Sequence, residues 1–503
     1  MAIHNEIEFE NEICEHLDAN GWLYSPKDAA GFVRGLALFP EDVVAWVKET
    51  QPDAWDVLTK NHGESAADTL LNRLRQSIDQ SGTLHVLRHG FDVLGMKTKV
   101  RMAQFRPASG INPDIMKRYA QNRLRVVRQV RYSLHNENNI DLVLFLNGIP
   151  VATAELKTDF TQSINDAVDQ YRFDRNPKPQ GQNAEPLLSF PNGALVHFAV
   201  SSSEVQMTTK LAGPKTFFLP FNQGSNGPGR TGSAGNPINP NGHRTAYLWE
   251  QVWQRDSWLD ILGRYLITEQ DKKKKIRTII FPRFHQLDVT RRLLSSVLSE
   301  GPGRKYLIQH SAGSGKTNSI AWSAHFLADL HDVNEQKVFD SVIVVSDRNV
   351  IDGQLSDAIE AMERTKGVVA NISGKSGSKS SELADALSGD KKVLVCTIQT
   401  FPFALEAVRK LASADGKRFA VIADEAHSSQ TGEAAAKLKQ VLTAEEQAEL
   451  ADGGEISTED ILAAQMSSKA KDSGITYVAF TATPKAKTLE TFGRLADPTK
   501  PAS

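Results

Sequence analysis

The segment that most narrows the fold of this chain is HSAGSGKT, at residues 310–317. It follows the short apolar run YLIQ and precedes a stretch whose composition suits a helix. Small residues at a strand-to-helix turn let backbone N–H groups point inward around phosphate oxygens. In such a loop Lys316 would reach the β- and γ-phosphates of a nucleotide, and the Thr317 hydroxyl would ligate Mg²⁺. The residues predicted to contact the nucleotide here are Gly313, Ser314, Gly315, Lys316 and Thr317.

A second segment, FAVIADEAH at residues 419–427, places acidic side chains at the end of an apolar run. Asp424 stands at the carboxyl end of this predicted strand, where α/β sheets place their ligands. We expect Asp424 to hold Mg²⁺ through water and Glu425 to orient or deprotonate the attacking water. His427 is expected to couple this site to neighbouring segments rather than to bind metal. On its own, the tetrad DEAH would fit a solvated helix start equally well.

Residues from 276 onward alternate between short apolar runs and helix-length stretches. The five runs are YLIQ, VIVVS, VLVCT, FAVIAD and ITYVAF. Such runs fit parallel strands that are buried on both faces. The generic phosphate loop starts with glycine, whereas this one starts with His310. The strand–loop–helix context compensates for this difference and supports a phosphate loop at residues 310–317. The sequence predicts a parallel-sheet domain with a phosphate loop over residues 276–503.

A different chemistry is indicated in the segment NNIDLVLFLNGIPVATAELK. A hairpin turn at Asn147-Gly148 would bring Asp141 back near Glu155, and Glu155 and Lys157 would share one strand face. Two such carboxylates can hold Mg²⁺, which stabilises charge on a phosphate and lowers the pKa of a water. Lys157 would position or activate that water. Taken alone, this spacing is more often a salt-bridged surface strand.

The rest of the first half is predicted as a compact α/β unit over residues 1–220. Residues 1 to about 80 have helical spacing of apolar residues, and a helix-compatible stretch covers 161–174. The strand candidates are TLHVLRHGF, KVRMAQFRP, RLRVVRQVRYS, DLVLFLNG, PVATAELK and LVHFAV. A connector over 221–275 contains a Gly-, Pro- and Asn-rich loop, then three tryptophans expected in a core, then a lysine run expected on a solvated linker. The tryptophans are Trp249, Trp253 and Trp258, and the lysine run is Lys272 to Lys275.

Composition describes an ordinary soluble chain, with 40% hydrophobic and 23% charged residues among 503. The formal net charge is -2, so DNA contacts would have to come from local basic surface. Residues 117–131 carry six basic side chains and no acid, which fits either phosphate contacts or a solvated surface. Only two cysteines are present, Cys14 and Cys396, which argues against a disulfide framework or a cysteine zinc site. No leader peptide or membrane span is visible, so a cytoplasmic location is expected.

The motor-like segments resemble those of helicase superfamily 2. In that resemblance Gln286 of FPRFHQ reads adenine, and TAT at 481–483 links ATP to nucleic acid. The carboxylate segment looks like the PD-(D/E)xK nucleases, with Ile140 replacing the usual proline. Gln170 resembles a glutamine that some of these nucleases carry near their site. Glu10 would add a third carboxylate, unless it is a surface helix residue.

Together, these segments resemble the restriction (R) subunit of type I restriction–modification enzymes. The resemblance implies a PD-(D/E)xK nuclease-like α/β domain followed by one RecA-like phosphate-loop domain. It also implies Mg²⁺ and ATP as cofactors, ATP-driven translocation of double-stranded DNA, and cleavage away from the recognition site. The implied partners are separate modification (methyltransferase) and specificity subunits, with no membrane.

The resemblance departs from the family at one place. The family motor needs a second RecA-like lobe, and only about twenty residues follow TATP. We therefore expect the chain alone to bind ATP, to be at most weakly nucleolytic, and to be unable to translocate. Two alternatives remain open. One is a DEAH-type ATPase whose N-terminal domain binds DNA but is catalytically silent. The other is a truncated product that only docks on a methyltransferase complex.

Overall fold

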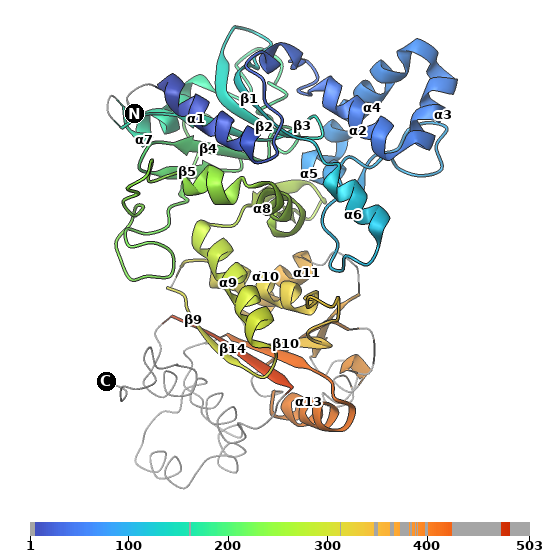
Figure 1. The fold of residues 1–503 in the computed structure, drawn as a ribbon, viewed down its shortest axis with the longest axis vertical. Helices are drawn as coiled ribbons and strands as arrows, with labels where there is room; N and C mark the ends of the chain where they lie inside the picture. The colour runs from blue at the N-terminus through green and yellow to red at the C-terminus, as the bar shows by residue number, and fades with distance from the viewer. Residues whose placement is uncertain are drawn as a thin grey trace. The chain divides into compact units, whose positions relative to one another are not determined.

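The computed structural model describes the chain in several ranges. These are residues 6–159, 162–311, 313–346, 351–362, 367–372, 382, 385–387, 389, 391–397, 401–424 and 474–482. The chain divides into two compact units, residues 1–285 and 286–503, which we describe separately (Figure 1). Within the described residues, no helix is long and apolar enough to cross a membrane.

The first unit begins with helices, as the spacing of apolar residues predicted. Its helices are α1 (Glu6–Ala19), α2 (Pro40–Thr50), α3 (Pro52–His62), α4 (Ala66–Ser81), α5 (Thr83–His89), α6 (Pro113–Ala120), α7 (Ile164–Asp169) and α8 (Arg255–Asp260). Short 3₁₀ turns cover Asp28–Gly31 and Gly63–Ser65, and π-helical segments cover Gln170–Asp174, Leu248–Val252 and Ile261–Tyr265. In α1, Phe9, Ile13 and Leu17 recur every four residues and are buried on one face.

Two predicted strands of the first unit are wrong. The segment TLHVLRHGF forms α5, because its buried residues Leu84 and Leu87 lie three apart, as on one face of a helix. The segment KVRMAQFRP forms no strand, and its contact with the preceding segment is a single bridge between Phe91 and Val100. The first strand of the sheet therefore starts at Leu124.

The six strands of this unit form one sheet in the order β1-β2-β3-β4-β5-β6. Their bounds are β1 (Leu124–Arg131), β2 (Asn139–Leu146), β3 (Ile149–Leu156), β4 (Val196–Val200), β5 (Val205–Thr208) and β6 (Leu219–Pro220). All neighbours are antiparallel except β3 and β4, which run parallel. The predicted hairpin is confirmed: Asn147 and Gly148 have φ of 50° and 82°, as a tight turn with two left-handed residues requires.

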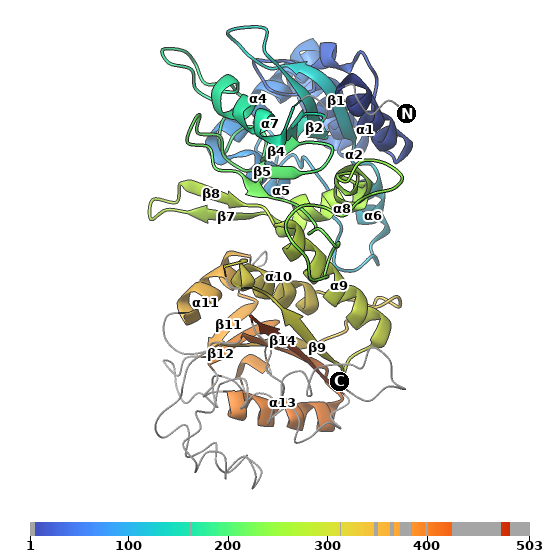
Figure 2. The same ribbon diagram turned by 90° about the vertical axis from the view of Figure 1, so that its left-hand side faces the viewer.

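The predicted connector, residues 221–275, starts with an irregular loop and continues into helices and a hairpin. Residues 222–242 contain no helix or strand, as predicted, and Trp249, Trp253 and Trp258 are buried in the core. The last strands, β7 (Ile267–Gln270) and β8 (Ile276–Ile280), pair as an antiparallel hairpin that projects from this unit in Figure 2. Lys272 to Lys275 form the exposed turn of this hairpin, where the sequence suggested a linker.

The second unit is a parallel sheet in the order β11-β12-β10-β13-β14-β9. Its strands are β9 (Lys305–Gln309), β10 (Ser341–Ser346), β11 (Val369–Ile372), β12 (Val393–Thr397), β13 (Phe419–Asp424) and β14 (Ile475–Thr481). Its helices are α9 (Phe284–Glu300), α10 (Lys316–Ala328), α11 (Ile351–Ala361) and α13 (Phe401–Asp415). All five predicted strands are confirmed, and β11 is one that the sequence did not reveal.

Two apolar layers cover this sheet. Helices α9, α10 and α11 cover one face of the sheet and α13 covers the other (Figures 1 and 2). Their side chains belong to two separate apolar clusters. Alternate residues of the same strand supply both layers: Val421 points to one cluster and Ile422 to the other. Burial on both faces explains why these strands read as continuous apolar runs.

Candidate nuclease and nucleotide sites

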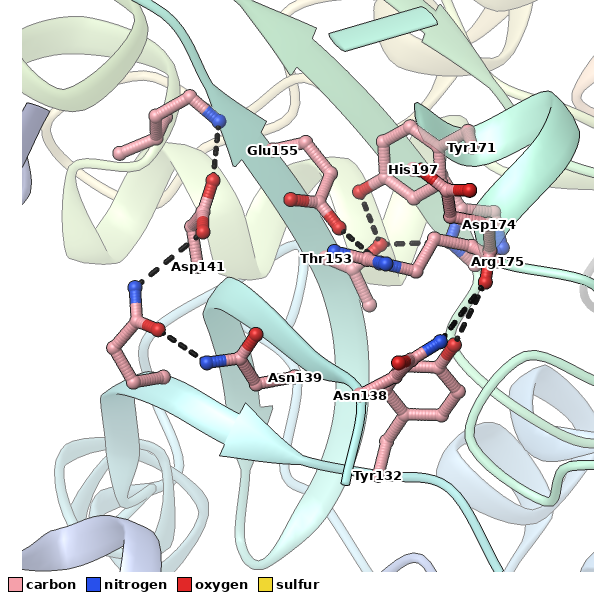
Figure 3. Close-up of polar contacts among 12 residues, drawn as sticks. Tyr132, Asn138, Asn139, Asp141, Thr153, Glu155, Tyr171, Asp174, Arg175 and His197 are labelled. Carbon is pink, nitrogen blue, oxygen red and sulfur yellow. Dashed lines mark hydrogen bonds and ion pairs between the residues drawn. The ribbon is translucent and has the colours of Figure 1, made fainter. Parts of the chain in front are cut away.

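Asp141 and Glu155 are adjacent across the β2–β3 hairpin. The ladder pairs Leu142 with Ala154, so the two carboxylates lie one step further along and on the same face. Asp141 is 8% exposed and Glu155 is fully buried at 0%. The backbone N–H of Leu156 donates to Asp141 Oδ2 at 2.8 Å, which fixes the carboxylate against β3 (Figure 3).

Glu155 is held by one cation. Nε of Arg175, which follows the π-helical segment after α7, donates to Glu155 Oε1 at 2.6 Å (Figure 3). Glu155 Oε2 is buried and accepts no hydrogen bond from the described residues. Burial and the nearby Asp141 charge raise the pKa of Glu155 well above its ordinary value, and Arg175 opposes this shift. The one cation therefore offsets only part of what raises the pKa of Glu155.

Lys157 lies two residues beyond Glu155 and is nearly buried. Its Nζ donates to Glu6 Oε1 of α1 at 2.6 Å. Glu6 is partly exposed, so this pair is the outer part of the group and lies closer to solvent than Glu155. The ammonium is thus held by an ion pair with α1, two residues beyond the buried Glu155.

Glu10 of α1 lies with the carboxylates and is not a surface residue, since it is only 2% exposed. The side-chain amide of Gln129 connects it to Asp141: Nε2 donates to Glu10 Oε1 at 2.6 Å and to Asp141 Oδ1 at 3.4 Å. Burial, followed by the charge of Asp141, raises the pKa of Glu10 to about 7, against the opposing charge of Arg128. The structure therefore brings Glu10, Asp141 and Glu155 into one region of the fold.

Gln170 lies nearby but is not bonded to the carboxylates. Its Oε1 is buried and has no hydrogen-bond partner among the described residues. The next residue, Tyr171, is fully buried, and its hydroxyl is hydrogen-bonded to Thr153 Oγ1 at 2.7 Å (Figure 3). Thr153 Oγ1 is in turn 2.7 Å from His197 Nδ1, and burial lowers the pKa of His197 to about 3. This neutral network starts at Thr153, two residues before Glu155, and therefore lies on the same face of β3 as that carboxylate.

Two functional candidates were missed from the sequence. Arg175 follows Glu155 by twenty residues and reaches it only because the chain returns through α7. Gln129 lies within a predicted strand, where the sequence does not distinguish it from its neighbours. In the structure its φ of 53° is unusual for a residue inside a strand. A basic or amide residue of this kind gives no local signal, because its role depends on the sheet register.

The donor set fits a hard divalent cation. Mg²⁺ takes oxygen ligands and is usually bound through one or two carboxylates, with water and substrate phosphate completing its shell. Asp141 and Glu155 supply two carboxylates, and the unpartnered Glu155 Oε2 is an available oxygen. Across the described ranges, no group of three or more His, Cys, Asp or Glu side chains forms a self-contained metal cage. The site fits a metal shared with a phosphate substrate better than a structural ion.

The nucleotide site forms where three neighbouring parallel strands end. The strands β13, β14 and β9 are adjacent, so Asp424, Thr481 and Gln309 lie at the same edge of the sheet. The phosphate loop leaves β9 there, and its Lys316 Nζ lies 2.8 Å from Asp424 Oδ1. Helix α10 begins at Lys316, directly after Gly315 with φ of 84°. Thr317 lies in the first turn of this helix.

His310 stands where the generic phosphate loop has its first glycine, and its side chain makes contacts within the loop. The ring is buried, with Nδ1 hydrogen-bonded to Ser314 Oγ and Nε2 2.9 Å from Ser319 Oγ. Its backbone N–H donates to the carbonyl of Thr481 at 2.7 Å, which connects the loop to β14. The imidazole therefore contacts the loop from inside, and the backbone N–H of the same residue connects the loop to the adjacent strand.

Gln286 also contacts the loop in this structure. Its Nε2 donates to the carbonyl of Gly315 at 3.0 Å, and a Cβ added to Gly315 would lie 2.5 Å from that nitrogen. Glycine is therefore favoured there by its positive φ, whereas the close contact involves only the flexible end of Gln286. Glu425, His427, Ala312 and Thr483 lie outside the described residues.

The basic run at 117–131 is largely neutralised within the fold. Arg123 and Arg125 both donate to the buried Asp42, at 2.9 and 2.6 Å. Arg128 pairs with Glu10 at 3.1 Å. These three side chains serve internal ion pairs, so the run is neither a simple solvated face nor a continuous phosphate-binding surface.

Comparison with known proteins gives a match on each unit. A model described as "Type I restriction enzyme R protein N terminus (HSDR_N)" matches residues 4–216. A model described as "SWI2/SNF2 ATPase" matches residues 285–498. The "Putative type I restriction enzyme MjaVIIIP endonuclease subunit" of Methanocaldococcus jannaschii is 22% identical over 472 residues, or 87% of this chain. The match covers 41% of that relative, so this chain spans about two fifths of its length.

Solved structures were also compared. The UvsW helicase from bacteriophage T4 has a TM-score of 0.26 at 15% identity, covering 48% of this chain and 64% of that one. The Hef helicase domain from Pyrococcus furiosus has a TM-score of 0.24 at 13% identity, covering 40% of this chain and 34% of that one. The paired family matches, one on the carboxylate unit and one on the phosphate-loop unit, together with this relative, support an R-subunit-type chain of type I restriction enzymes.

Proposed function

We propose that this chain supplies the nuclease and one ATP-binding lobe of the motor of a type I restriction enzyme. Its reaction would be Mg²⁺-dependent double-strand cleavage of unmodified foreign DNA, coupled to ATP-dependent translocation. The observation that carries the proposal is the buried pair Asp141 and Glu155, with one Glu155 oxygen that accepts no hydrogen bond from the described residues and with Lys157 two residues further along. Modification and specificity subunits would be its partners, and the cytoplasm its location.

The chemistry of the first unit follows from its own residues. A bound Mg²⁺ would stabilise charge on the scissile phosphate and lower the pKa of a coordinated water. Asp141 is kept in a single orientation by the Leu156 N–H, so one carboxylate oxygen is fixed before any ligand arrives. Glu155 offers its second oxygen, while Arg175 holds the first. The Lys157 ammonium would leave Glu6 and donate instead to a phosphate oxygen or a water.

The second unit would bind ATP through the loop after β9. Lys316 pairs with Asp424 in this structure, and a nucleotide would provide phosphate oxygens for the ammonium instead. Thr317 and Asp424 are the proposed ligands of the nucleotide-associated Mg²⁺, and Gln286 would contact adenine. Glu425 is proposed to act on the attacking water.

The rival function, an ATPase with a silent N-terminal module, makes a different prediction for two substitutions. Asp141→Ala and Lys157→Ala should abolish restriction of unmodified phage DNA in cells that carry the partner subunits. Both variants should still bind a fluorescent ATP analogue, which Lys316→Ala should not. If the two nuclease-site variants restrict phage as well as the wild type, the first unit is not the nuclease.

A further inference from the structure

Gln129 has a backbone conformation that its position in a strand does not explain. It lies inside β1 with φ of 53°, in the left-handed region that glycine or asparagine usually occupies. The flanking ladder is intact, since Arg128 pairs with Leu142 and Val130 with Ile140. Gln129 is therefore opposite Asp141, and the unusual φ is confined to this one residue of the ladder. Strain that the surrounding structure maintains at a single residue points to a function for its side chain.

The side chain makes three contacts, all on the carboxylate side of the sheet. Its Nε2 donates to Glu10 at 2.6 Å and to Asp141 at 3.4 Å, so one amide nitrogen serves both carboxylates. Its carbonyl oxygen accepts from the amide of Asn139. That third bond orients the group, because it turns the carbonyl away from the two acids and the N–H groups toward them.

The two carboxylates come from different elements. Glu10 is on α1 and Asp141 is on β2, and both are almost completely buried. Two buried like charges repel. The Leu156 N–H bonds to Asp141 and Arg128 pairs with Glu10, so these donors set the position of each acid rather than the separation between them. The amide of Gln129 fixes this separation with both groups pointing toward one donor.

We infer that Gln129 is a positioning residue of the nuclease site, which holds Glu10 and Asp141 in a geometry suited to a divalent cation. This inference rests on the proposed nuclease function. It assigns no contact between Gln129 and the metal or DNA.

The test compares Mn²⁺ binding and unfolding of the full chain. Gln129→Gly accommodates the positive φ but removes the amide, and Asn139→Ala leaves Gln129 in place but removes the group that orients it. We expect Mn²⁺ affinity, measured by calorimetry, to fall roughly 10- to 100-fold in Gln129→Gly and by a smaller factor in Asn139→Ala. Both variants should show a cooperative thermal transition, and the Mg²⁺ concentration for half-maximal DNA cleavage should rise in the same order.

Lys274→Gly is the matched control. Lys274 also has a positive φ, 61°, but it lies in the exposed β7–β8 turn. Its replacement by glycine relieves the same backbone conformation away from the carboxylates, so Mn²⁺ affinity should not change. If Gln129→Gly and Asn139→Ala bind Mn²⁺ as tightly as the wild type, the inference is wrong and the proposed function stands. A wild-type chain that neither binds Mn²⁺ nor cleaves DNA would overturn both.

Discussion

Nε of Arg175 lies 2.6 Å from Oε1 of Glu155, and both side chains are buried. This ion pair joins the segment after α7 to the middle of the sheet, at the point where the candidate nuclease carboxylates meet. A buried ion pair of this kind need not add net stability, but breaking it leaves one charged group without a partner. The pair therefore links the stability of the first unit to the state of its candidate metal site.

Removing the cation should destabilise the first unit. We expect Arg175→Met to lower the free energy of unfolding by about 3–5 kcal/mol, because Glu155 would remain buried without its partner. Urea denaturation followed by fluorescence of the buried tryptophans measures this loss. The double variant Glu155→Gln with Arg175→Met should recover part of it, since no buried charge is left. A loss below about 1 kcal/mol in Arg175→Met would mean that Glu155 is already neutral in the wild type.

The stability of the first unit should depend on pH through Glu10. Its pKa is raised in the folded protein from 4.5 to about 7, so the folded state binds the proton more tightly than the unfolded state. The stabilisation from this group is therefore fully present below about pH 4.5 and is lost as the pH rises through about 7. The loss for one group amounts to at most about 3 kcal/mol.

Glu10→Gln tests this pH dependence, because the amide cannot titrate. The free energy of unfolding of the wild type should fall more steeply between about pH 5 and pH 8 than that of Glu10→Gln. The comparison cancels contributions from groups that both proteins share. Parallel profiles for the two proteins would show that Glu10 does not titrate in this range.

His310 should contribute to nucleotide affinity by bracing the phosphate loop. Its ring contacts Ser314 and Ser319 from inside the loop, so His310→Ala removes both contacts. We expect about a tenfold weaker affinity for an ATP analogue, equivalent to roughly 1.4 kcal/mol, measured by fluorescence titration. His331→Ala is a matched control, because that ring bonds to the carbonyl of Asp329, the residue after α10, and not, among the described residues, to the phosphate loop. Equal affinity in His310→Ala and the wild type would show that the loop is ordered without the imidazole.

Local sequence patterns predicted much of the fold, and the segments where the structure differs from the prediction have physical reasons. The β2–β3 hairpin could be predicted because Asn147-Gly148 suits a turn that fixes the register and hence the approach of Asp141 to Glu155. The α5 segment looks like a strand because Leu84 and Val86 are two residues apart, as on one face of a strand. Leu84 and Leu87 are three apart, as on one face of a helix, so the pattern fits both structures.

The ion pairs of the site could not be predicted in the same way. Arg125 looked available for phosphate because no acid lies near it in the sequence, yet Asp42 and Asp28 reach it from the first helices. Arg175 and Gln129 depend on the same kind of distant return of the chain. Charge patterns along a chain identify ionisable groups, and only the tertiary structure decides which of them are neutralised.

The central claim, that the first unit cuts DNA with Asp141 at its metal site, is tested most directly by cleavage of duplex DNA in vitro. Supercoiled DNA, Mg²⁺ and ATP would be incubated with the wild type, Asp141→Asn, and the exposed control Asp53→Asn, together with the partner subunits. We predict Mg²⁺-dependent double-strand cleavage by the wild type and by Asp53→Asn, and loss of cleavage in Asp141→Asn with ATP binding retained. Cleavage by Asp141→Asn at the wild-type rate would contradict the account.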